Sequence, residues 1–258
     1  MKPYVIWSPP YHECSGGIRV LHRLCHELTK RDIETYITTE VLCDDLLETS
    51  YRDDSDDFIA VYPEIVAGNP LGAKTVARWV LNVPGRLAGE TEYDKDEIIF
   101  PFSRILNQWG LPEERVLYLP ELNLDFYYDK NDRPRHNKVA YFGKGKGAVD
   151  KDTIVLGNKP TVERADLLRS SYVMYCFDNM TAMMNVSRLC GCPVVLIPNG
   201  ELTEEQLNMW ETGRDGIAYG KEQYLRTTNF HSGDYRLKYK EEIKKFDEKL
   251  ENFIKETQ

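Results

Sequence analysis

The sequence of 258 residues lacks any long apolar run and any excess of positive charge. Because no run of about 18 apolar residues occurs, we expect no transmembrane helix. The first residues, MKPYVIWSPPYHE, also lack the basic and apolar segments of a secretory signal, so we expect a cytoplasmic protein. Lys and Arg number 33 against 42 Asp and Glu, a net charge of −9. A nucleic-acid-binding surface needs the opposite sign, so we do not expect nucleic acid among the partners.

The six cysteines do not have the spacing of a metal site or a disulfide framework. In Cys190-Gly191-Cys192 the thiols have no second pair of ligands and no histidine close by in the sequence. Their neighbours are apolar, which predicts buried, reduced thiols rather than a redox motif. Gly191 is typical of a helix C-terminus, and Pro193 suits the start of the next strand.

The sequence also lacks the motifs of several enzyme classes. It contains no G-x-S-x-G elbow, no H-E-x-x-H motif, no G-x-G-x-x-G and no Walker A loop. Asp54-Ser55-Asp56 matches the D-x-D of metal-dependent glycosyltransferases. It lies in an acidic stretch before an expected strand, which favours a solvated loop, and we expect no metal site.

Short apolar runs alternate with helical patterns along residues 1–122, the first expected lobe. A helix is expected from Ile18, where apolar residues recur at spacings of three and four. The pattern predicts a second helix around Ala73–Leu81 and strands at 4–7, 35–39, 58–62, 98–102 and 115–119.

Residues 123–137 lose this periodicity and gain charge, which predicts a linker. The alternation resumes over 138–234, the second expected lobe, with strands at 139–142, 153–156, 172–176 and 193–197 and helices at 161–169, 181–189 and 201–210. Residues 235–258 are a charged amphipathic helix. Alternating strands and helices predict an α/β fold with two doubly wound, Rossmann-like lobes, each a parallel sheet with helices on both faces.

Ligands of an open parallel sheet bind beyond the carboxyl ends of its strands, and this rule selects two loops of the first lobe. In HECSGGIRV, Gly16 and Gly17 either let a ligand approach the following helix N-terminus or form a tight turn. His12 is a candidate base for an attacking hydroxyl, or an exposed loop residue. Glu64 and Asn69 follow the strand at 58–62 and are candidates for acceptor binding, or ordinary loop residues.

The same rule selects two loops of the second lobe. GKGKG, residues 143–147, places Lys144 and Lys146 on flexible backbone, which suits a diphosphate or a solvated turn. In FDNMT, residues 177–181, the side chains of Asp178, Asn179 and Thr181 are helix-capping types. The same helix start could also hold a phosphate or ribose, and the two roles are compatible.

Together these features resemble the GT-B glycosyltransferases, especially the retaining, rhamnosyltransferase-like group. The first lobes of that family begin with strand, Gly-Gly loop and helix, as YVIWSPPYHECSGGIRVLHRLCHEL does here. Their second lobes carry an E-x7-E stretch ending in E-A-x-x-x-G-x-P-V-V, which NVSRLCGCPVV matches from Leu189 onward. Asp178 stands for the first glutamate, but Val186 occupies the position of the second. Asn185 would then have to replace it at the donor ribose.

The resemblance implies a metal-independent transferase of polysaccharide biosynthesis. Such an enzyme moves a sugar from a nucleotide-diphosphate donor to a hydroxyl of a glycan or other acceptor and needs no bound cofactor. Lysines and helix N-termini would stabilise the leaving diphosphate, and the last helix would cross back to the first lobe. The implied partners are a nucleotide sugar and a glycan acceptor, with the oligomeric state open. A non-catalytic nucleotide- or sugar-binding protein and a sugar-nucleotide epimerase remain alternatives.

Overall fold

The computed structural model describes residues 1–41, 43, 45–51, 57–130, 132, 134–157 and 159–258, so Asp54-Ser55-Asp56 lies outside the described residues. The chain divides into two compact units. Unit 1 comprises Met1–Glu121 and Glu242–Gln258, and unit 2 comprises Leu122–Glu241. The segment 123–137, expected as a linker, belongs to unit 2 in this division.

In the described part of unit 1, five parallel strands form one sheet in the order β2-β1-β3-β4-β5. Helix α1 (Gly16–Thr29) connects the first two strands. Ser15 caps this helix, because its side-chain hydroxyl accepts a hydrogen bond from the backbone N–H of Ile18 at 3.4 Å. The strands are β1 (Tyr4–Ile6), β2 (Thr35–Ile37), β3 (Ile59–Pro63), β4 (Thr75–Val80) and β5 (Ile98–Pro101).

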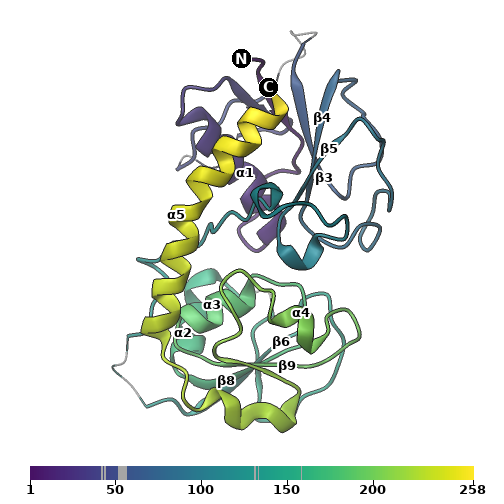
Figure 1. The fold of residues 1–258 in the computed structure, drawn as a ribbon. Helices are drawn as coiled ribbons and strands as arrows, with labels where there is room; N and C mark the ends of the chain where they lie inside the picture. The colour runs from purple at the N-terminus through teal and green to yellow at the C-terminus, as the bar shows by residue number, and fades with distance from the viewer. Residues whose placement is uncertain (42, 44, 52–56, 131, 133, 158) are drawn as a thin grey trace. The chain divides into compact units, whose positions relative to one another are not determined.

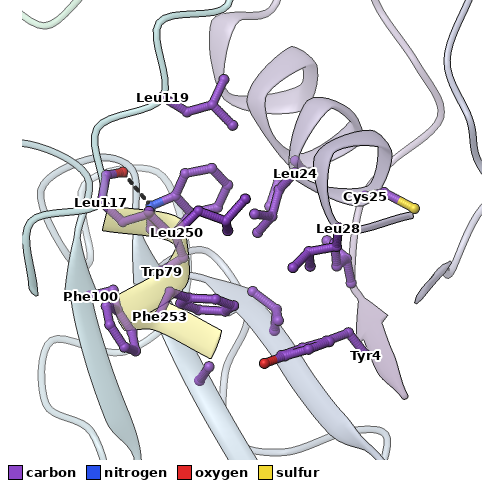
Figure 2. Close-up of a cluster of buried hydrophobic side chains, with 14 of the residues drawn as sticks. Tyr4, Leu24, Cys25, Leu28, Trp79, Phe100, Leu117, Leu119, Leu250 and Phe253 are labelled. Atoms are coloured by element: carbon purple, nitrogen blue, oxygen red, sulfur yellow. Dashed lines mark hydrogen bonds between the residues drawn. The ribbon is translucent and has the colours of Figure 1, made fainter. Parts of the chain in front are cut away.

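The core of unit 1 lies on the face of the sheet that α1 and the last turns of the C-terminal helix cover (Figure 1). Figure 2 shows Trp79 of β4 among leucine and phenylalanine side chains from both helices. Trp79 is fully buried, and its indole N–H donates to the carbonyl of Leu117 at 3.1 Å. The Phe253 ring stacks on Tyr4 and meets Phe100 edge-on. Aromatic packing therefore fixes the C-terminal segment on the sheet.

The opposite face of this sheet carries no helix from the fully described connections 64–74 and 81–97, which corrects the expectation of helices on both faces. Val66, Ala73 and Leu71 from the loop after β3 pack there against Val5 and Tyr62. Loop side chains thus replace a helix as the cover of the apolar surface.

For two segments of this unit, the secondary structure predicted from the sequence was wrong. The expected helix at 73–81 is replaced by strand β4 (Thr75–Val80), because a central parallel strand is buried on both faces and its continuous apolar run imitates a helical pattern. Residues 115–119 form no strand: a 3-10 helix spans Glu113–Arg115, and the N–H of Leu117 bonds to the carbonyl of Pro101 at 2.9 Å.

In the described part of unit 2, five parallel strands form a sheet in the order β10-β9-β8-β6-β7. Numbered within each unit, both sheets have the strand order 2-1-3-4-5, a doubly wound, flavodoxin-like order. Strand β10 was not expected from the sequence. The elements are β6 (Asn137–Tyr141), β7 (Ile154–Val155), α2 (Thr161–Arg169), β8 (Ser171–Cys176), α3 (Met183–Leu189), β9 (Val194–Leu196), α4 (Glu204–Leu207), β10 (Ile217–Tyr219) and a 3-10 helix at Lys221–Thr227.

The C-terminal helix α5 (Ser232–Thr257) has its first turns in unit 2 and the rest, from Glu242, in unit 1 (Figure 1). In unit 2, the Tyr239 hydroxyl accepts from the N–H of Leu122 at 3.2 Å. In unit 1, the Thr257 and Tyr4 hydroxyls are 2.5 Å apart. Among the described residues, no helix has the length and hydropathy that a bilayer crossing needs.

The Cys190-Gly191-Cys192 segment forms the end of α3 and the turn into β9. Cys190 is the C-cap residue of α3, and Gly191 follows with a left-handed φ of 77°. A Cβ at this position would overlap the carboxylate of Asp129 and the guanidinium of Arg135, which are paired at 2.7 Å. Gly191 is therefore required both by the helix end and by the ion pair above it.

Replacing Gly191 tests this assignment. We expect Gly191→Ala to lower the free energy of unfolding by about 3 kcal/mol, because alanine would meet left-handed strain and an overlap with the ion pair. Gly213→Ala is the matched control, since Gly213 has a φ of 68° but its nearest atom is 4.0 Å away. The control should lose only about 1–2 kcal/mol. Equal losses in urea denaturation would contradict the packing role.

The thiols of this segment should be chemically inert in the folded protein. Burial raises the pKa of Cys190 and of Cys192 to about 12. Since the thiolate is the reactive form and only about 1 in 10,000 of each thiol is ionised at pH 8, both should react slowly. We expect iodoacetamide to label the half-buried Cys14 before either of them, as measured by peptide mass spectrometry. Early labelling of Cys190 or Cys192 would revive a redox role.

Candidate functional site

The strand order brings the expected site residues together in pairs of loops. In each sheet the first and third strands are neighbours, and their carboxyl ends mark the point where this fold binds ligands. In unit 1, residues 12–17 follow β1 and residues 64–69 follow β3. In unit 2, the 143–147 loop follows β6 and the 177–181 loop follows β8. Each unit thus has one candidate ligand-binding site, at the carboxyl edge of its sheet.

The two loops of unit 2 are joined by the buried carboxylate of Asp178. Its Oδ2 accepts from the backbone N–H of Lys144 at 3.1 Å, and its Oδ1 accepts from the N–H of Met180 at 3.2 Å. Hydrogen bonds from neutral N–H groups to a charged acceptor are strong, so this carboxylate holds both backbones. Asp178 therefore organises the edge.

The glycines of the 143–147 loop are explained by the same packing. A Cβ on Gly143 would overlap Asp178, one on Gly145 would overlap the carbonyl of Phe177, and one on Gly147 would overlap its ring. The Phe177 ring also stacks on Phe142, with centroids 4.6 Å apart. These glycines serve loop-on-loop contact within the chain.

Lys144 and Lys146 are exposed on this pinned loop. Among the described residues, neither ammonium group has a hydrogen bond or a salt bridge. The nearby carboxylate of Asp178 is turned to backbone N–H groups instead. Two cations are therefore presented at the carboxyl edge of the sheet from a backbone fixed by hydrogen bonds.

Asn179 and Thr181 complete the edge in different ways. Asn179 is fully buried, and its amide nitrogen donates to Oδ1 of Asn199 at 2.5 Å. Its Oδ1 is shielded from solvent and has no hydrogen-bond partner within the described structure. Thr181 Oγ1 accepts from the N–H of Met183 at 3.2 Å, but the N-cap residue of α3 is Ala182, which makes no side-chain cap hydrogen bond.

Asn185 lies in the core of unit 2. Its Oδ1 accepts from Arg188 at 2.8 Å and from the Tyr235 hydroxyl at 2.9 Å. The guanidinium of Arg188 also lies over the Tyr235 ring, 4.0 Å from its centroid. Because this oxygen is engaged in the core, we do not assign Asn185 to the donor. Val186 is buried as well, with 3% of its surface exposed.

In unit 1, the orientation of His12 bears on its expected role as a base. The side chain is exposed, and Nδ1 accepts from the N–H of Cys14 at 3.2 Å. That bond assigns the proton of a neutral ring to Nε2. Accepting a proton from a hydroxyl would require the bond to Cys14 to open or the ring to change tautomer.

Gly16 and Gly17 form the first turn of α1. A Cβ on Gly17 would lie 3.9 Å from the Leu81 side chain, which is an ordinary contact. Glycine inside a helix is less favourable than alanine by about 1 kcal/mol. Packing within the described chain does not require Gly17, in contrast to Gly145, and close approach of a ligand at Gly17 stays a prediction.

Glu64 and Asn69 shape the loop that contains them. Glu64 is buried, and its Oε2 accepts from the N–H of Leu81 at 2.9 Å. Asn69 Oδ1 accepts from the Tyr62 hydroxyl at 3.0 Å and from the N–H of Ala73 at 3.1 Å. These bonds give both residues a role in the fold, and acceptor binding stays a prediction.

A buried arginine that the sequence reasoning missed also fixes this loop. Arg78 of β4 is fully buried, and its guanidinium donates to the carbonyls of Val66 at 2.6 Å and Gly68 at 3.0 Å. Glu97 accepts two further bonds at 2.7 and 2.8 Å. The signal was a single arginine inside the apolar run TVARWV, which indicates a buried ion pair.

A buried His–Glu pair that the sequence reasoning also missed lies beside the loop after β1. His22 of α1 is fully buried, with Nδ1 2.7 Å from Glu48 Oε1 and Nε2 3.1 Å from the carbonyl oxygen of Pro9. The signal was its spacing, four residues after Ile18 and three before Cys25 on the apolar face of α1.

Within the described residues, no group of three or more His, Cys, Asp or Glu could hold a metal ion.

Alanine substitutions can test why glycine occurs in each of the two loops. Gly145→Ala should lower the free energy of unfolding by about 2 kcal/mol or more, because the Phe177 carbonyl cannot move aside. Gly17→Ala should leave it unchanged or raise it by less than about 1 kcal/mol. Thermal and urea unfolding measure both. A stable Gly145→Ala protein would show that loop packing does not explain that glycine.

Neither a scan against models of known protein families nor a search of characterised proteins finds a match to this chain. The fold and the two candidate edges are therefore the basis for assigning a function. Of the two, the edge of unit 2 has exposed cations, a buried oxygen without a partner among the described residues, and loops fixed by a shared carboxylate.

Proposed function

We propose that the chain is a metal-independent glycosyltransferase that uses a nucleotide-diphosphate sugar. The observation that carries the proposal is the pair of exposed ammonium groups, Lys144 and Lys146, on the loop that Asp178 fixes. They lie where β6 and β8 end side by side, the position at which doubly wound sheets bind nucleotides. A diphosphate carries the charge that two such cations complement.

The proposed chemistry follows from that placement. As the bond between the sugar and the diphosphate breaks, negative charge builds up on the leaving diphosphate. Cations held in advance on a fixed backbone stabilise that charge without reorganising. The acceptor hydroxyl forms the new bond to the sugar and gives up its proton, for which His12 is the candidate base.

A non-catalytic protein that binds a nucleotide or sugar is the second candidate. Val186 supports it, because a buried valine stands where the resemblance expects a carboxylate for the donor ribose. The engaged oxygen of Asn185 does not replace that carboxylate. Both candidates predict nucleotide binding, and they differ in turnover.

Binding at the proposed site can be tested with a thermal-shift screen of UDP, GDP, TDP, ADP and CMP. A nucleotide that binds only the folded protein raises its melting temperature. For the nucleotide found, Lys144→Glu should weaken binding roughly tenfold or more in calorimetry, through loss of a charge-assisted contact and gain of repulsion. Lys240→Glu, an exposed lysine of the same unit on α5, should bind unchanged. Equal affinity of both variants would remove Lys144 from the site.

Turnover then separates the two candidates. The wild-type chain, incubated with the matching nucleotide sugar and a panel of glycan acceptors, should release free nucleotide diphosphate and a glycosylated product. Epimerisation would leave the nucleotide attached to the sugar, so released diphosphate also argues against an epimerase. Binding without release across the panel would establish the non-catalytic protein instead.

A further inference from the structure

Unit 2 has a pocket of about 660 Å³ at the edge of its sheet opposite the proposed donor loops. Its lining includes Tyr172 at the start of β8, Pro193 before β9 and Arg135 before β6. Because the strands are parallel, these amino ends share one edge and the 143–147 and 177–181 loops share the other. The pocket is therefore separate from the site proposed above.

A β-bulge places an aromatic ring in this pocket. Asn137 and Lys138 of β6 pair with Ser171 and Val173 of β8, so Tyr172 is an extra residue without a partner in the ladder. Bulges of this kind redirect a side chain and recur beside binding sites. The redirected Tyr172 lines the pocket together with Tyr224 of the 3-10 helix and Phe230. Three aromatic residues thus contribute to its lining.

The charged groups of the pocket are already matched to one another. Asp129 pairs with Arg135 at 2.7 Å and accepts from the Ser232 hydroxyl at 2.9 Å. Asp234 lies in the first turn of α5, whose N–H groups and positive end favour a carboxylate. An anion would meet these two carboxylates, and a cation would meet the guanidinium and the helix end. The pocket therefore favours an uncharged ligand.

The polar groups at its rim suit hydroxyls. Thr228, His231 and Asp234 also line the pocket, are exposed, and offer hydrogen-bond donors and acceptors. Small-ligand sites combine aromatic lining residues with a few placed polar groups. One face of a pyranose ring carries C–H bonds that pack on an aromatic ring, while its hydroxyls reach the rim.

From these observations we infer that this pocket is a second carbohydrate-binding site, which holds an uncharged sugar ring on Tyr172. The inference goes beyond the proposed transferase and does not depend on it, because none of the donor residues lines the pocket. In a chain that acts on glycans, such a site would hold sugar units that are not the reacting ones.

Saturation-transfer difference NMR tests the site on the full chain. The probes are glucose, galactose, mannose, rhamnose and N-acetylglucosamine at millimolar concentration. We expect at least one to receive saturation from the protein, most strongly on its ring protons. A panel without any signal would overturn the inference.

Variants at one position then separate stacking from general packing. Tyr172→Phe keeps the ring and should keep the signal, whereas Tyr172→Leu keeps apolar volume without the ring and should weaken binding at least tenfold. Tyr128→Ala is the matched control, since Tyr128 and Tyr172 are each 39% exposed and Tyr128 does not line the pocket. An unchanged signal in Tyr172→Leu would overturn the inference.

Competition distinguishes this site from the donor site. A nucleotide that binds near Lys144 should leave the saccharide signal in place, and Lys144→Glu should bind the saccharide as the wild type does. Loss of the signal under either condition would assign the sugar to the donor edge and overturn the second site. Retention of the signal without any nucleotide binding would sink the transferase and leave the pocket supported.

Discussion

The carboxylate of Asp178 is the group on which the candidate site depends. By accepting from Lys144 and Met180 it ties the loop after β6 to the loop after β8. The contact is so close that Gly143 and Gly145 have no room for a side chain. A buried carboxylate in this setting is stable only with such N–H partners, so the loops and the charge hold each other in place. The positions of the exposed lysines, Lys144 and Lys146, therefore depend on Asp178.

Other polar residues follow the same principle. Backbone groups in loops without helices still need hydrogen-bond partners, and buried side chains supply them. Arg78 does so for the loop after β3, and Asn69 closes the turn within that loop. A polar residue after a strand is therefore ambiguous in the sequence, because the fold and a ligand make the same demand. Lys144 and Lys146 differ, since no partner within the described structure accounts for them.

At the other edge of the same sheet, the Asp129–Arg135 pair has a comparable role. It excludes any side chain at Gly191, and through Ser232 it reaches the start of α5. Burial raises the pKa of the cysteines on either side of Gly191, whereas the nearby guanidinium of Arg135 lowers it. The two edges differ in the charge they offer: unpaired cations among the described residues at one, and matched charges beside aromatic rings at the other.

The sequence by itself determined the elements whose pattern has a single meaning, namely the amphipathic helices α1 and α5 and most strands, and it also located α2. It could not determine β4, since a strand buried on both faces and a helix give similar apolar runs, nor the short β10. Only the tertiary structure decided why each glycine and polar residue is there. Gly145, Asn185 and Arg78 are explained by contacts with residues distant in the chain, and local spacing carries no record of those contacts.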